Sequence, residues 1–145
     1  MTTVAQIALP WSTRADHHCF GCAPGNPHGL GLTFTAEGPG LRTDFALGHH
    51  YESYPDVVHG GIVALICDET MGNLIVLRAD RPAVTTSLRM RYVDTVHTGL
   101  PYRVTAALIS RTPDLIGAVA DVTDAHDDLV ASATATYHPL PRSAS

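Results

Sequence analysis

The chain of 145 residues carries 14 acidic and nine basic residues, which gives a formal net charge of −5 at pH 7. This length corresponds to a single domain, which we place over residues 1–145. The negative charge argues against nucleic acid as a main partner, and the 45% of hydrophobic residues indicate a globular domain whose surface is partly covered by another copy.

Neither a membrane span nor a disulfide framework is expected. The longest apolar run, residues 62–67, is far too short to cross a bilayer, and the N-terminus does not combine basic residues with an apolar core as a signal peptide does. The three cysteines are an odd number, which does not suit a secreted disulfide scaffold. We therefore expect a cytoplasmic protein with no membrane partner.

The first third of the chain is predicted to contain an arm, a loop and a hairpin. Residues 1–18 form the N-terminal arm, and residues 19–31 are dense in Gly and Pro, which favours a tight, ordered loop. Residues 32–36 and 41–47 alternate between apolar and polar side chains and flank the turn sequence Glu37-Gly38-Pro39-Gly40. These two runs predict a β-hairpin.

Two cysteines in the loop have the spacing of a metal-binding pair. Cys19 and Cys22 form a CxxC, and three histidines are nearby, namely His17, His18 and His28. A structural zinc site needs four ligands, and the sequence has no second CxxC to supply the other two. We therefore expect a packed loop and no metal.

A long helix is predicted over residues 60–78, where apolar residues recur every three or four positions. Apolar residues occupy most of its circumference, so the helix should be buried on nearly all sides. Four strand-like runs follow it, at residues 83–93, 102–110, 115–122 and 129–137, before a flexible tail at 139–145.

One helix among so many strands is buried most easily if an antiparallel sheet wraps around it. The pattern therefore predicts an α+β domain with an antiparallel sheet around one long central helix. One helix cannot cover every edge and face of such a sheet, and association of two copies would cover the remainder.

The segment that starts the helix combines two chemical features. It begins with His59, Gly60 and Gly61, and a helix N-terminus with so little side chain offers bare backbone N–H groups to an anion or an oxyanion. Asp68 and Glu69 lie in its apolar middle, where an unpaired carboxylate costs several kcal/mol. A buried acid is either satisfied by partners or functional.

Three segments together resemble the hotdog-fold acyl-CoA thioesterases of the phenylacetate-pathway (PaaI-like) group. They are YPDVVHGGIVALICDETMG at residues 54–72, CFGCAPGNPHGLGL at 19–32 and VTTSLRMRYV at 84–93. The resemblance extends over roughly residues 19–138 and implies the hotdog fold, in which the antiparallel sheet wraps around the central helix.

The resemblance also implies roles for individual residues. The backbone N–H of Gly60, with Gly61 beside it, would polarise the thioester carbonyl, and Asp68 would act as nucleophile or general base. A hydroxyl residue early in the following strand would help to place the acid or the attacking water. This position falls on Thr85, or on Thr86 if the register shifts by one residue.

Three further residues have open assignments. Ser53 stands where some members of the group carry an amide. Glu69, about 100° around the helix from Asp68, is the main rival for the role of base. His59 is either a general acid or, as we favour, a cap that orients the turn.

The spacing of Gly60 and Asp68 has a consequence for assembly. Eight residues of helix separate them by about 12 Å along the axis, so they cannot contact the same carbonyl within one chain. The resemblance therefore predicts a homodimer, or a tetramer built from such dimers, in which Gly60 of one subunit faces Asp68 of the other.

The expected function is hydrolysis of an acyl-CoA or acyl-carrier thioester, with coenzyme A as part of the substrate and no other cofactor. Two alternatives stay open, a hydroxyacyl-thioester dehydratase of the same fold and a non-catalytic acyl-CoA binding module. The acyl group cannot be read from the sequence. Candidates for contact with the CoA phosphates are Arg78, Arg81, Arg89 and Arg91.

Overall fold

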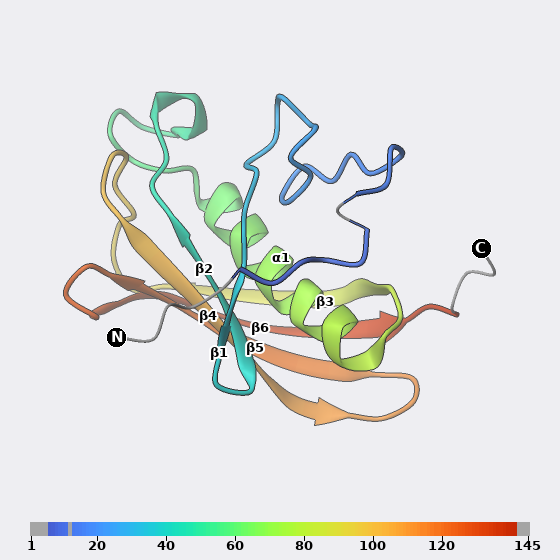
Figure 1. Cartoon of the computed structure of the whole chain (residues 1–145). Helices are drawn as coiled ribbons and strands as arrows, with labels where there is room; N and C mark the ends of the chain where they lie inside the picture. The colour runs from blue at the N-terminus through green and yellow to red at the C-terminus, as the bar shows by residue number, and fades with distance from the viewer. Residues whose placement is uncertain (1–5, 12, 142–145) are drawn as a thin grey trace.

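The computed structural model describes residues 6–11 and 13–141, so the ends of the expected arm and tail lie outside the described residues. Six strands form one antiparallel sheet in the order β1-β2-β4-β5-β6-β3, and one long helix lies on its face (Figure 1). The elements are β1 (Thr35–Glu37), β2 (Gly40–Phe45), the 3-10 helix η1 (His49–Tyr51), α1 (Gly60–Ala79), β3 (Ala83–Tyr92), β4 (Tyr102–Arg111), β5 (Ile116–Asp124) and β6 (Leu129–Pro139).

The predicted order of elements and the α+β class are confirmed. The main difference lies in the hairpin, whose first strand begins at Thr35 rather than at residue 32. The chain before it instead belongs to the loop, where the Leu32 N–H donates to the Gly21 carbonyl at 2.8 Å and the Leu30 N–H to the Phe20 carbonyl at 2.8 Å. These bonds confirm a tight, ordered loop.

Helix α1 lies between the sheet and the N-terminal loop (Figure 1). Small residues on the central strands let it approach the sheet closely, because Ala118, Ala120, Ala133 and Ala135 are all at most 3% exposed. The helix is long and apolar enough to cross a membrane by length and composition. Its buried face, which includes Ile66, Cys67 and Met71, identifies it as the core helix of the domain.

Strand β3 forms one edge of the sheet and pairs only with β6. Apolar side chains of this strand are exposed in the single chain, since Val84, Leu88 and Tyr92 are 46%, 37% and 50% exposed. A bulge between Thr85 and Ser87 interrupts the alternation of side chains along this strand. The opposite edge, β1, is only three residues long.

Candidate active site

The start of α1 is ordered by its own first residues. His59 caps the helix, with its Nδ1 accepting a hydrogen bond from the Gly61 N–H at 2.9 Å. The Gly60 carbonyl accepts a bond from the Tyr92 hydroxyl at 2.6 Å. Among the described residues, the Gly60 N–H donates a hydrogen bond to no acceptor. This N–H at the positive end of the helix dipole is therefore available to a ligand.

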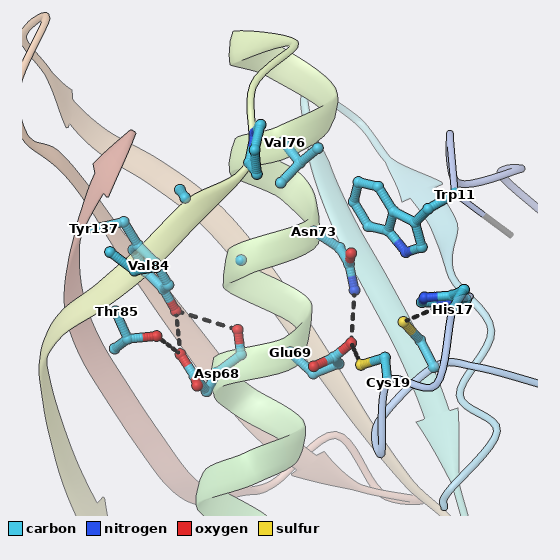
Figure 2. A pocket seen from close by; sticks show the side chains of 14 residues that line it. Trp11, His17, Cys19, Asp68, Glu69, Asn73, Val76, Val84, Thr85 and Tyr137 are labelled. Carbon is cyan, nitrogen blue, oxygen red and sulfur yellow. Dashed lines mark hydrogen bonds between the residues drawn. The ribbon is translucent and has the colours of Figure 1, made fainter. Parts of the chain in front are cut away.

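Asp68 is held by two hydroxyl groups from different strands. Its Oδ1 accepts hydrogen bonds from Thr85 Oγ1 at 2.8 Å and from the Tyr137 hydroxyl at 2.7 Å (Figure 2). Tyr137 also donates to the Asp68 backbone carbonyl at 3.2 Å. No described group bonds to the second carboxylate oxygen, Oδ2. One oxygen is thus fixed while the other remains able to accept a proton or attack a carbonyl.

Tyr137 is almost fully buried beneath this carboxylate. Burial, together with the charge of Asp68, raises the pKa of the Tyr137 phenol, so the phenol stays protonated and donates. Its ring also lies where a side chain on Gly72 would project, with a Cβ there 3.6 Å from the Tyr137 ring. The tyrosine is therefore held both by packing and by its bonds to Asp68.

Glu69 points to the other side of the helix (Figure 2). Its Oε1 accepts hydrogen bonds from the Cys19 thiol at 3.1 Å and from Asn73 Nδ2 at 3.2 Å. Glu69 therefore belongs to the contact between α1 and the N-terminal loop. It shares no hydrogen-bond partner with Asp68.

A cavity of about 490 Å³ opens beside both carboxylates. This volume lies within the usual range for small-molecule sites. Its walls come from the helix, the start of β3 and the N-terminal loop, and include Trp11, His17, Asp68, Asn73, Val84, Thr85 and Tyr137 (Figure 2).

The helix start faces a different cavity. A second hollow of about 330 Å³ is lined by His50, Tyr51, Glu52, His59, Gly61 and Ile62. Neither Asp68 nor Thr85 lines it, and neither Gly60 nor Gly61 lines the first cavity. Within one chain, the structure does not bring the N–H donors and the Asp68 carboxylate together.

Two predicted substrate-binding residues lie away from both hollows. Ser53 is exposed and lines neither of them. The Thr86 hydroxyl meets the Thr136 hydroxyl at 2.7 Å, because the register that places Thr85 on Asp68 turns the next side chain away from it. Tyr137 was missed by the sequence reasoning. The feature that could have identified it is its place in the run 129–137, where Tyr137 is a large polar residue after a series of small ones.

The cysteines have different environments. Burial raises the pKa of the Cys67 thiol to about 12, which makes this thiol unreactive. Hydrogen bonding with Cys22 lowers the pKa of Cys19, and the same contact raises that of Cys22. The two loop sulfurs lie within 4.8 Å of each other.

No protein-family model and no curated protein matches the sequence. Solved structures do match. A thioesterase superfamily protein aligns over 83% of this chain and 60% of its own length, with 21% identity and a TM-score of 0.76. This chain has the hotdog fold. The aligned part of the chain spans less than two thirds of the length of that thioesterase superfamily protein.

Two other hotdog structures are informative about the group. A putative thioesterase of Ralstonia eutropha, described as phenylacetic acid degradation-related, has 22% identity and a TM-score of 0.68 over 75% of this chain and 85% of its own. The smu.793 protein of Streptococcus mutans, solved with acetyl-CoA, has 19% identity and a TM-score of 0.70 over 77% of this chain and 90% of its own. The expected resemblance to this group of structures is confirmed at the level of fold.

Proposed function

We propose that this hotdog protein hydrolyses acyl-CoA thioesters, with Asp68 as nucleophile or general base. The observation that carries the proposal is the Asp68 carboxylate, whose Oδ1 is fixed by Thr85 and Tyr137 while its Oδ2 has no partner among the described residues. Asp68 lines a cavity of ligand size. An oriented carboxylate with one available oxygen is what activation of water or attack on a carbonyl requires.

The reaction can follow either of two routes at Oδ2. As a base, the carboxylate takes a proton from water while the hydroxide adds to the acyl carbon, and the proton then passes to the departing CoA thiolate. As a nucleophile, Oδ2 bonds to the acyl carbon and expels the thiolate, and water cleaves the resulting anhydride. Both routes place negative charge on the carbonyl oxygen, which the Gly60 N–H would stabilise by ~3 to 4 kcal/mol.

Because the start of α1, through His59 and Gly61, faces a different cavity from Asp68, the proposal requires a second subunit. Strand β3 supplies a suitable surface, since ten residues of unpaired backbone edge carry exposed apolar side chains. Such an edge is a ready template for pairing with another strand. We propose that two copies pair through β3, related by a two-fold axis.

One register of this pairing assembles the site. Thr85 bonds to Asp68 near one end of β3, and Tyr92 bonds to Gly60 at the other end. When Thr85 of one copy lies opposite Tyr92 of the partner subunit, Asp68 of one copy approaches Gly60 of the other. Because the bulge between Thr85 and Ser87 removes one residue from the count, the two-fold axis of this register passes through Arg89.

Two arginines of β3 are candidates for contact with the CoA phosphates. Arg89 and Arg91 are exposed and line a polar surface hollow together with Ser132 and Thr134. The crystallised complex of a hotdog relative with acetyl-CoA supports a nucleotide thioester as the ligand class. Guanidinium groups bind phosphates through paired hydrogen bonds.

The test is release of free thiol from a panel of short, long and aromatic acyl-CoAs. We expect turnover by the wild-type protein and a loss of at least ~100-fold in kcat in Asp68→Asn, because an amide is neither a base nor a nucleophile. Thr85 and Tyr137 can still donate to the amide oxygen, so the fold should be kept. Asp114→Asn, which makes the same change in the loop before β5, is the matched control.

Two other outcomes would redirect the assignment. A larger loss in Glu69→Gln than in Asp68→Asn would move the base to Glu69. Formation of enoyl-CoA from hydroxyacyl-CoA without thiol release would indicate a dehydratase, whereas saturable binding without turnover would indicate a binding module. His59 is poorly placed for a dehydratase, because its Nδ1 already accepts the cap bond from Gly61.

A further inference from the structure

A cluster of sulfur, oxygen and nitrogen atoms lies where the N-terminal loop meets α1. Cys19, Cys22 and Glu69 each offer one ligand atom, and these three atoms lie within 4.8 Å of one another. His17 joins the cluster at Cys22, with its Nε2 3.8 Å from the Cys22 sulfur. The expectation of no metal rested on the lack of a second CxxC, and the fold brings two other candidate ligands, His17 and Glu69, to the first one.

We propose that Cys19, Cys22, His17 and Glu69 bind a zinc ion. Zinc in proteins is usually four-coordinate and tetrahedral, with sulfur at ~2.3 Å and nitrogen or oxygen at ~2.0 to 2.2 Å, which places neighbouring ligand atoms about 3.6 Å apart. The distance of 3.8 Å between Cys22 Sγ and His17 Nε2 fits this spacing. The distance of 3.1 Å between Cys19 Sγ and Glu69 Oε1 needs to lengthen by about half an ångström, which small side-chain rotations allow.

The charges around Glu69 support a cation at this position. The carboxylate is partly buried, and no arginine or histidine nitrogen of the described residues lies within 4 Å of it. Its observed donors are the Cys19 thiol and Asn73. A bound divalent ion would displace the thiol protons of Cys19 and Cys22 and offset two of the three negative charges of the carboxylate and the two thiolates.

The backbone holds the cluster in place before any ion binds. Gly21, between the two cysteines, lies so close to Glu69 that a Cβ there would be 2.5 Å from the Glu69 carboxyl carbon. The Ala23 N–H donates to the Cys19 carbonyl at 3.0 Å and closes the turn that carries both sulfurs. Cys19, Cys22 and Glu69 therefore come together without a rearrangement of the loop, and His17, which contacts Cys22 but lies outside this group, would move toward the other ligands on binding.

A second acidic group in the described part of the chain does not share these properties. His49, Glu52 and Asp56 also lie close together, but His49 and Asp56 are exposed. Glu52 Oε2 is already engaged by His49 at 2.7 Å, the Asp56 N–H at 2.8 Å and Thr98 at 3.2 Å. These hydrogen bonds stabilise the loop, and the group has no sulfur ligand that would favour zinc.

The proposed ion has a structural role. Four protein ligands leave no open position for substrate, so zinc would pin the loop onto α1 at the residue next to Asp68. Cys19, Cys22 and His17 all line the cavity beside Asp68, so the pinned loop would form a wall of that cavity. The inference does not depend on the proposed thioesterase activity, and its test measures metal directly.

The first experiment is the zinc content of protein purified in reducing buffer without chelator, measured by inductively coupled plasma mass spectrometry. We expect about one zinc per chain in the wild type, and at least a tenfold lower content in Cys22→Ser and His17→Ala, because each removes a ligand. Cys67→Ala and His18→Ala are matched controls outside the cluster and should keep the zinc. Equal zinc contents in Cys22→Ser and the wild type would overturn the proposal.

The second experiment uses cobalt and the unaltered chain, so it does not rely on a variant that folds. Metal-free, reduced protein is titrated with Co²⁺, and we expect intense visible bands of tetrahedral cobalt with a thiolate charge-transfer band in the near ultraviolet. These bands should disappear when zinc is added. Absence of the bands in protein with native circular dichroism, or a Cys19–Cys22 disulfide formed in reducing buffer, would show that the pair is not a metal site.

Discussion

At the scale of single residues, the Asp68 carboxylate is positioned by groups that do not themselves react. Thr85 and Tyr137 approach the same oxygen from β3 and from its neighbour β6. A hydrogen bond to a charged group is typically worth ~1.5 to 3 kcal/mol, so each of them contributes measurably to holding the acid. Neither is expected to contact the reacting carbon.

We predict that Thr85→Val lowers kcat about tenfold with little change in KM, because the acid loses one of two bonds that orient it. Thr85→Ser restores the hydroxyl and should recover most of the rate. Thr86→Val is the matched control, since Thr86 bonds to Thr136 instead. Steady-state kinetics on all three variants check the prediction, and an equal loss in Thr86→Val would contradict it.

The sequence could predict the relative positions of residues that are close together along the chain. The cap of His59 on Gly61 and the divergence of Asp68 and Glu69 follow from helix geometry. Tyr137 could not be assigned, because its contact with Asp68 depends on the strand order. The contact of Cys19 with Glu69 was hidden for the same reason, since it joins a loop and a helix that are distant in sequence.

At the scale of elements, the first position of α1, Gly60, has a backbone environment that can accept a proline. His59 has φ −55° and ψ 130°, and this ψ lies within the range adopted by residues that precede a proline. A Cβ on Gly60 would be 3.4 Å from the Tyr92 hydroxyl, which that group can accommodate. The backbone N–H of Gly60 can thus be removed by substitution without disturbing the helix.

Gly60→Pro is predicted to keep the fold and to lower kcat by ~100- to 1,000-fold, because proline is favoured at the first helical position but has no N–H to stabilise the oxyanion. Gly60→Ala adds the same Cβ and keeps the N–H, so its loss should be much smaller. Circular dichroism and thiol-release kinetics test both variants. Similar losses in the two would show that space, rather than the donor, matters at this position.

The sequence predicted where the helix and strands lie along the chain better than it predicted which strands pair with each other. Periodicity located the helix and four strands, since both patterns reflect burial that is local to the element. It could not show that β3 lies at the edge beside β6, because β4 follows β3 in sequence yet pairs with β2 and β5.

At the scale of the whole molecule, the proposed site is divided between two subunits. Asp68 lines one cavity of a chain, the start of α1 lines another through His59 and Gly61, and β3 provides the long edge through which copies could pair. A dimer of this kind contains two equivalent sites, each built from both chains.

This arrangement predicts that two inactive variants can restore each other. A heterodimer of Asp68→Asn with Gly60→Pro combines both lesions in one site and leaves the other site intact, so about half of the wild-type activity should return. Differently tagged subunits can be co-expressed, purified in tandem and assayed for thiol release. If the heterodimer is as inactive as its parents, the two residues act within one subunit and the shared site is wrong.

The separation of the two cavities also links catalysis to the law of mass action. If neither subunit is competent alone, dilution below the dissociation constant removes activity faster than it removes protein, and the rate then varies with the square of the total concentration. The cell would control such an enzyme through the amount it makes, and a modest change in abundance would produce a larger change in flux.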